Sequence, residues 1–315
     1  SILSTLFSIR ASKLSTLKRD NNMSIDKKKE TVKSRSLLQQ TWHRLLKNKG
    51  AVIGMIFLIA LVAVSFAAGY IYDYDNDIIA INVNNALQKP SMQHWFGTDN
   101  LGRDIFARIL YGARYSLMIG VGAVSIGLVI GITLGAVAGF YGGMIDQIIM
   151  RIVDVFYSIP NIMIAVVIVS LLGTSTVNLL IALCFTCATS FTRIARAAVM
   201  TIRDQQYVEA AYELGLPTWK IIIKHILPNC LSPIIVQVTL LIGTTIIAAS
   251  SLSFLGIGVP SPAPEWGAML SEGRKYVRVA GYMCVTPGIA IMLTVLALNL
   301  LGDGLRDALD PKMKK

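Results

Sequence analysis

The chain has 315 residues, of which 54% are hydrophobic and 15% are charged, and its formal net charge is +11. A soluble domain carries about a quarter charged residues, so this composition excludes an ordinary soluble globular protein. Uncharged apolar runs of about 20 residues recur along the chain, which predicts an all-α protein that crosses a membrane several times.

The first 49 residues are strongly basic, with twelve Lys and Arg against three acids. Such a tail can bind nucleic acid, or it can mark a cytoplasmic N-terminus by the positive-inside rule. No aromatic residue lies between Arg10 and Trp42, although aromatic residues usually accompany basic ones in nucleic-acid sites. We therefore predict that residues 1–49 are a cytoplasmic tail with the start of the first helix, and we expect no nucleic-acid partner.

Six membrane spans are predicted, with approximate bounds 50–72, 114–140, 148–172, 177–196, 231–258 and 281–302. With the N-terminus inside, the inner segments hold 22 of the 29 Lys and Arg. This asymmetry predicts that both termini are cytoplasmic. The expected layout is the first span at 50–72, an outer segment at 73–113, a five-helix core at 114–302 with a cytoplasmic loop at 197–230, and a cytoplasmic C-terminus at 303–315.

The outer segment is expected to end in a helix that lies at the membrane surface. Thr98 or Asp99 is placed to cap a helix that begins near Asn100. Its apolar face would hold Ile105, Phe106, Ile109, Leu110 and Ala113, with Arg103 and Arg108 off that face. Such a helix serves either as a membrane anchor or as a docking surface for an external partner.

The second span carries Gly127, Gly131, Gly135 and Gly139, which recur every four residues. Residues at this spacing share one face of a helix, and glycines there allow a neighbouring helix to approach closely. This pattern predicts tight packing and specifies no function.

Chemistry-bearing motifs are missing from the sequence. No span has a charge near its middle, which argues against a proton- or sodium-coupled transporter. A phosphate-binding loop, a zinc-protease motif and a nucleophile–histidine–acid set are also missing. We therefore predict no catalytic residue and no metal site in this chain.

Four hydroxyl residues lie in the fifth span: Thr245, Ser250, Ser251 and Ser253. They either line a translocation path or pack against neighbouring helices, and hydroxyls in membrane helices often serve packing.

The loop from 197 to 230 contains a helical pattern at 201–214 that ends at Gly215, a residue able to adopt a left-handed turn. Tyr207, Ala211 and Leu214 share one side of this helix. Pro217 can then open a second short helix through Trp219. The expected product is a pair of cytoplasmic helices with Leu216 and Trp219 exposed. Such an apolar knob either fits a partner's groove or packs on its own bundle, and physical reasoning does not choose between them.

The residues Glu209-Ala210-Ala211, followed by Gly215 and by Leu227-Pro228, resemble the EAA loop of ABC importer permeases. His225 stands where that pattern usually has an apolar residue. Four other segments resemble the C-type permeases of dipeptide, oligopeptide, glutathione and nickel importers: "HWFGTDNLGRDIFARILYGARYSL", "IMRIVDVFYSIPN", "SLSFLGIGVPSPAPEWGAML" and "LLGDGLRDALDPK". The first 35 or so residues lie outside this resemblance.

The resemblance implies a type I ABC importer permease with six transmembrane helices in a bacterial plasma membrane. It implies a heterodimer with a sister permease, two ATPase subunits that bind ATP and Mg²⁺, and an extracytoplasmic peptide-binding protein, all in contact with membrane lipid. The chain itself would bind no cofactor and hydrolyse no ATP. Its coupling residues would be Glu209, Ala210, Ala211, Leu214, Gly215, Leu216 and Trp219.

The substrate class implied is di- or oligopeptides, with glutathione or a nickel or metal–chelator complex as the alternative within the same family. From other classes, a stand-alone channel or secondary transporter would move substrate without ATPase partners. A membrane scaffold would bind soluble proteins without moving any substrate.

Overall fold

The computed structural model describes residues 37–309; the basic tail predicted at the N-terminus therefore lies largely outside the described residues. The chain divides into two compact units, residues 1–43 and residues 44–315. Only the start of helix α2 belongs to the first unit, and all elements discussed below belong to the second. In residues 37–309 the structure is helical, and its one β-bridge joins Thr98 to Asp104.

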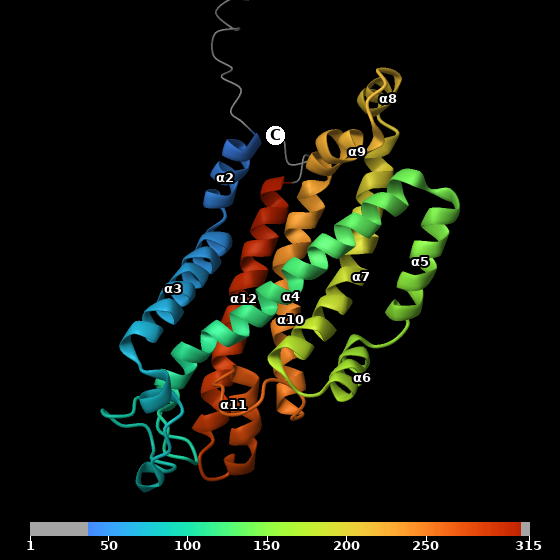
Figure 1. Ribbon diagram of the computed structural model, residues 1–315. Coiled ribbons are helices and arrows are strands. Elements are labelled where there is room, and N and C mark those ends of the chain that lie inside the picture. The colour runs from blue at the N-terminus through green and yellow to red at the C-terminus, as the bar shows by residue number, and fades with distance from the viewer. Residues whose placement is uncertain (1–36, 310–315) are drawn as a thin grey trace, which may run out of the picture. The chain divides into compact units, whose positions relative to one another are not determined.

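Most helices follow one another with short connections, and the longest connections are residues 86–104 before α4 and 255–265 before α11 (Figure 1). Their bounds are α2 (Leu37–Lys47), α3 (Lys49–Ile71), η1 (Tyr74–Ile78), η2 (Val83–Asn85), α4 (Ile105–Tyr141), α5 (Gly143–Tyr157), α6 (Asn161–Leu172), α7 (Thr176–Arg203), α8 (Gln206–Glu213), α9 (Thr218–Ile221), η3 (Ile222–Ile226), η4 (Leu227–Cys230), α10 (Leu231–Phe254), α11 (Trp266–Gly273), η5 (Arg274–Tyr276) and α12 (Tyr282–Leu309).

Within residues 37–309, five helices are long and apolar enough to cross a membrane. A sixth crossing arises if the bent pair α5 and α6 forms a single span. The predicted span 148–172 is thus broken, because α5 and α6 meet at 86°. Pro160 begins the second helix, and its ring nitrogen has no hydrogen to continue the ladder of the first.

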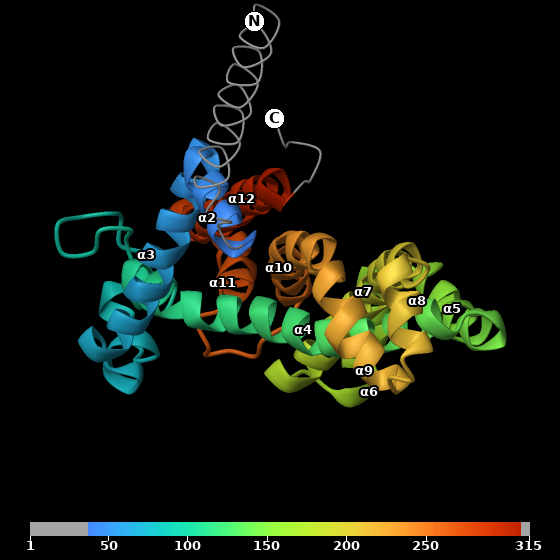
Figure 2. The ribbon, with the colours of Figure 1, turned by 90° about the horizontal axis from the view of Figure 1, so that it is seen from above.

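Helix α4 is the central element of the second unit. It contacts α3, α10 and α7 in turn, which stand along it when the unit is viewed from above (Figure 2). The predicted glycine stripe faces α7. A Cβ added at Gly127 would lie 2.6 Å from Cys187 Cβ, and one at Gly131 would lie 2.4 Å from Phe191 Cβ. The prediction of a close helix contact is confirmed, because these separations leave no room for a side chain.

The start of α4 differs from the prediction. The cap is Asp104, whose side chain accepts a hydrogen bond from Ala107 N at 2.9 Å, and neither Thr98 nor Asp99 caps this helix. The helix then continues without interruption to Tyr141, so there is no separate surface helix before the second span. Ile105, Ile109 and Ala113 of the predicted apolar face are buried within the chain, and so are Arg103 and Arg108, which the prediction placed off that face.

Candidate functional site

The pair α8 and α9 lies at the end of the unit that the sequence predicts to be cytoplasmic, beyond α7 and α10 (Figure 1). The two helices are joined at Gly215, which has φ +73°. Gly215 N donates to Tyr212 O at 3.0 Å and Leu216 N donates to Ala211 O at 3.3 Å, which closes the end of α8. The predicted turn between two short helices is confirmed.

An apolar cluster holds this pair against the bundle. Val208, Ala211, Ile221 and Ile226 are buried together with residues of α4, α7 and α10. Because Val208 and Ala211 form the packed side of α8, Tyr207 and Leu214 lie exposed, although the helical pattern groups them with Ala211. Leu216 is partly buried against the same cluster, so it is not the exposed residue that the sequence predicted.

The remaining apolar side chains of this region form a surface, which we call the inner knob (Tyr207, Tyr212, Leu214, Trp219 and Ile223). Leu214 is 81% exposed and Trp219 is 60% exposed. Sequence reasoning missed Tyr212 and Ile223, although Ile223 follows Trp219 by four residues and such residues share a helix face. An exposed apolar group of this size on a cytoplasmic loop is typical of a protein interaction site.

Two other predicted coupling residues of the loop lie in contact with solvent. Glu209 and Ala210 are exposed, and no ion pair joins Glu209 to another residue in the described part of the chain. The nearby basic residues of α7 are engaged elsewhere. Arg196 is paired with Asp146 of α5, and Arg203 Nη1 donates to Gly139 O at 2.9 Å.

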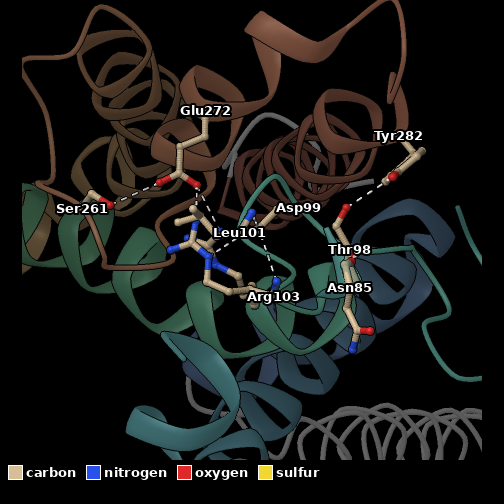
Figure 3. Close-up of polar contacts among 9 residues, drawn as sticks. Asn85, Thr98, Asp99, Leu101, Arg103, Ser261, Glu272 and Tyr282 are labelled. Carbon is tan, nitrogen blue, oxygen red and sulfur yellow. Dashed lines mark hydrogen bonds and ion pairs between the residues drawn. The ribbon is translucent and has the colours of Figure 1, made fainter. Parts of the chain in front are cut away.

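The opposite end, which the sequence predicts to be extracytoplasmic, contains four charged side chains in one cluster, which we call the outer lock (Asp99, Arg103, Arg108 and Glu272). Figure 3 shows that Glu272 of α11 reaches toward the outer segment. Arg103 donates from Nε to Asp99 Oδ2 at 2.6 Å and from Nη2 to Glu272 Oε2 at 2.8 Å. Arg108 Nη1 donates to the same two oxygens at 2.5 and 3.1 Å. Two cations thus balance two carboxylates.

Because its charges are largely buried, breaking an ion pair of the outer lock should cost a large part of the free energy of unfolding. The Arg108 side chain is 1% exposed and that of Asp99 is 3% exposed. An ion in such a place costs several kcal/mol unless a partner neutralises it. Glu272 Oε1 also accepts from Ser261 Oγ at 3.3 Å, so the cluster fastens the outer segment, α11 and the loop before α11 together.

Two further contacts secure the same end. Tyr282 Oη, at the start of α12, donates to Gln88 O at 2.9 Å. Glu265 is fully buried and caps α11 by accepting from Gly267 N at 2.9 Å and Ala268 N at 2.8 Å. Sequence reasoning identified neither role: the partner of Tyr282 lies 194 residues away in the chain, and the local cap formed by Glu265 was not predicted.

The four predicted path residues have different surroundings. Thr245, Ser250 and Ser253 are buried within this chain. Thr245 Oγ1 lies 3.4 Å from Cys187 Sγ, Ser250 Oγ donates to Glu265 Oε1 at 3.5 Å, and Ser253 Oγ accepts from Val259 N at 3.2 Å. Ser251 is half-buried. Together with Ser250, it lines a hollow of about 440 Å³ bounded by α6, α10, α11 and α12.

Residues 131–315 match the family described as binding-protein-dependent transport system inner membrane component. Residues 36–90 match the N-terminal transmembrane domain of oligopeptide transport permease C. No group of three or more His, Cys, Asp or Glu placed to hold a metal ion occurs in residues 37–309.

The chain is similar to curated transport proteins over most of its length. It is 46% identical over 276 residues to the dipeptide transport system permease protein DppC of Alkalihalophilus pseudofirmus, covering 88% of this chain and 90% of that protein. It is 44% identical over 276 residues to the glutathione transport system permease protein GsiD of Pectobacterium atrosepticum, covering 88% and 91%.

Among solved structures, two inward-facing forms of the MetNI methionine ABC transporter share the fold. One has a TM-score of 0.55 at 19% identity and covers 65% of this chain and 98% of the other; the second has 0.52 at 20%, covering 64% and 97%. The predicted all-α permease architecture is thereby confirmed. The apolar helices, the matched family and the full-length relatives together show that the chain belongs to the inner membrane permease components of binding-protein-dependent ABC importers.

Proposed function

We propose that this chain is the membrane subunit through which a peptide importer couples ATP use to the passage of di- or oligopeptides. The observation that carries the proposal is the inner knob. Its helix pair is packed firmly against α4, α7 and α10 by Val208, Ala211 and Ile221, while Leu214 and Trp219 remain exposed. A rigid element with an unfilled apolar surface can transmit motion from a partner to the bundle.

The partners that fit this role are two cytoplasmic ATPase subunits, which supply ATP and Mg²⁺ binding, and a sister permease that completes the path. An extracytoplasmic binding protein delivers the peptide. Closure of the ATPases moves the helix pair and turns the bundle outward, and hydrolysis returns it inward. Glu209 makes a polar contact with the ATPase, and Ser250 and Ser251 are the residues proposed for the path because they line the hollow beside α10.

Peptides are proposed as substrate because a relative at 46% identity is named a dipeptide permease. Glutathione is the second candidate, since relatives named for glutathione transport reach 44% and 46% identity. Uptake of a radiolabelled dipeptide and of labelled glutathione by cells with and without this chain separates the two. A loss confined to glutathione uptake would replace the first candidate by the second.

The coupling role is tested by changing Gly215 to Val and by using Gly173 to Val as the matched control. Both glycines have positive φ, +73° and +90°, and an added Cβ meets no atom within 4 Å at either position. Gly173 has ψ 161°, a backbone conformation nearly restricted to glycine, so the control substitution carries a strain of about 1–3 kcal/mol, at least as large as that at Gly215, but only Gly215 lies in the helix pair.

Each variant, tagged at its C-terminus, is purified from native membranes in mild detergent, and its copurified proteins and peptide-stimulated ATPase activity are measured. We expect Gly215→Val to lose most of the stimulation while Gly173→Val retains it. If wild-type chain purifies without ATPase subunits, even after gentle crosslinking, the importer mechanism is wrong and a self-contained channel takes its place.

A further inference from the structure

The outer segment differs in charge from the rest of this basic protein. Residues 72–104 contain five acids and two basic residues, whereas the whole chain has a net charge of +11. Asp99 and Arg103 neutralise each other within the outer lock. The charge left at the surface of this segment is therefore negative, and it faces the extracytoplasmic side.

A cavity of about 590 Å³ opens in this negative surface. Its walls come from the turn at 72–82, the loop at 93–95 and the first residues of α4. The volume lies within the range of small-ligand pockets. Gly102 allows the two walls to meet, because a Cβ there would lie 1.8 Å from Asn82 O.

The cavity is lined by two carboxylates, Asp77 and Asp104, and by one permanently charged cation, Arg103. Asp104 pairs with His94 at 2.7 Å, and the Arg103 guanidinium is held by Asp99 and Glu272. Asp77 accepts a hydrogen bond from Asp73 N at 2.8 Å, and no ion pair in the described part of the chain involves it. Burial raises the pKa of Tyr72 in the cavity wall, and the carboxylates of Asp104 and Asp77 raise it further. The cavity is thus a place of negative potential.

Aromatic rings lie beside these carboxylates. Trp95 is 63% exposed, and its ring centroid lies 4.9 Å from that of Phe106, which also lines the cavity. Carboxylates flanked by aromatic rings suit a cation with an apolar stem, because the rings attract the charge and cover the methylenes. A bare metal ion fits less well, since residues 37–309 contain no group of three or more His, Cys, Asp or Glu that could hold one.

We propose that this cavity, the outer socket (Asp77, Trp95 and Asp104), receives a lysine or arginine side chain of the soluble extracytoplasmic binding protein. The inference rests on the proposed function, which supplies that partner. Ile81, which lines the cavity, is exposed, and so are Val83 and Met92, which lie next to lining residues in the chain. They provide the apolar contact that a docked protein needs around a single inserted cation.

The test uses the whole complex, with its ATPases, in lipid nanodiscs. The probe is the purified binding protein of the same transporter, and its Kd is measured by biolayer interferometry at several salt concentrations. The key variant is Asp77→Asn, which keeps a side-chain oxygen for the Asp73 N hydrogen bond. The matched control is Asp75→Asn, which removes the same charge from an exposed residue of the same turn that does not line the cavity.

We expect Asp77→Asn to weaken binding about tenfold and to flatten its salt dependence, because one charge pair is lost. Asp77→Lys should weaken binding further, and Trp95→Ala should accelerate dissociation. Asp75→Asn should change Kd by less than about twofold.

Equal effects of Asp75→Asn and Asp77→Asn on Kd would show that the proposed socket is wrong and that only the net negative charge of the outer segment affects binding. An unchanged Kd for Asp77→Lys would also overturn it, as would a free dipeptide that competes with the binding protein for the socket. In each of these cases the ATPases still copurify and their stimulation by peptide persists, so the proposed function survives. Absence of the ATPases from the wild-type complex overturns both proposals.

Discussion

The two ends of the unit are stabilised by different interactions. At the outer end, the buried carboxylate of Asp99 pairs with the buried Arg103 and Arg108, and both arginines also pair with the partly exposed Glu272 of α11. At the cytoplasmic end, α8 and α9 are held by aliphatic packing, and their aromatic and aliphatic residues remain exposed. The charges of the outer lock are thus paired within this chain, whereas the inner knob is an apolar surface that no residue within 37–309 covers. Substitutions in the outer lock should therefore affect folding, and substitutions in the inner knob should affect association.

The largest effect is expected for Asp99→Ala. It removes the carboxylate shared by Arg103 and Arg108 and leaves a buried positive charge without compensation, which costs about 3–5 kcal/mol. The midpoint of thermal unfolding in detergent should fall clearly, and the yield in membranes should drop. Asp75→Ala, an exposed acid in the same outer segment, is the control. Equal stability of the two variants would contradict the importance of the outer lock.

The next effect concerns association. Trp219→Ala should weaken ATPase binding by about 2 kcal/mol or more, as expected for an aromatic anchor, while thermal unfolding of the isolated chain changes little. The ratio of ATPase to permease after purification reports the first quantity. The claim that Trp219 serves association rather than folding is wrong if Trp219→Ala lowers the thermal stability of the isolated chain as strongly as the buried-core substitution Val208→Ala.

A smaller loss of stability is expected for Glu265→Ala, which removes the cap of α11 and two backbone hydrogen bonds. Loss of a helix cap costs about 1–2 kcal/mol. Glu265→Gln retains an oxygen for these backbone donors and should recover part of the loss. A Gln variant that is no more stable than the Ala variant would show that the negative charge, rather than the hydrogen bonds, is the important property.

The smallest effect is expected for Glu209→Ala, because this side chain is exposed and the structure shows no ion pair for it in residues 37–309. Stability should change by less than about 0.5 kcal/mol. ATPase stimulation should nevertheless fall, whereas Glu213→Ala, an exposed acid in the same short helix, should leave it nearly intact. A marked loss of stability in Glu209→Ala would place the residue in the fold rather than at the interface.

The sequence predicted those parts of the structure that depend on neighbouring residues. Apolar runs located the long helices, and Gly215 located the turn between α8 and α9. It did not identify the start of α4, because Thr98, Asp99 and Asp104 are all acceptable caps and local rules do not rank them. Pro160 is a local indication that the helix breaks near this residue, but the angle between α5 and α6 depends on packing.

The outer lock could not be predicted from the sequence, for a different reason. Arg108 was assigned to the polar side of a surface helix, yet its side chain is 1% exposed. Its second acid partner, Glu272, lies 164 residues further along the chain. A buried charge is tolerated only with that distant partner, and periodicity carries no information about such pairs. The inner knob was better predicted because its residues lie within one short loop, although Leu216 proved to be partly buried.

Helix α4 begins at the outer socket and ends beside the helix pair of the inner knob. Its 37 residues give a length of roughly 55 Å at about 1.5 Å per residue. This exceeds the hydrocarbon thickness of a bilayer, about 30 Å, so the helix projects or tilts. It is therefore long enough to reach both sides of the membrane as one rigid element. A rotation of about 10° around its midpoint would carry the two ends roughly 5 Å in opposite directions, enough to couple an event on one side of the membrane to a displacement on the other.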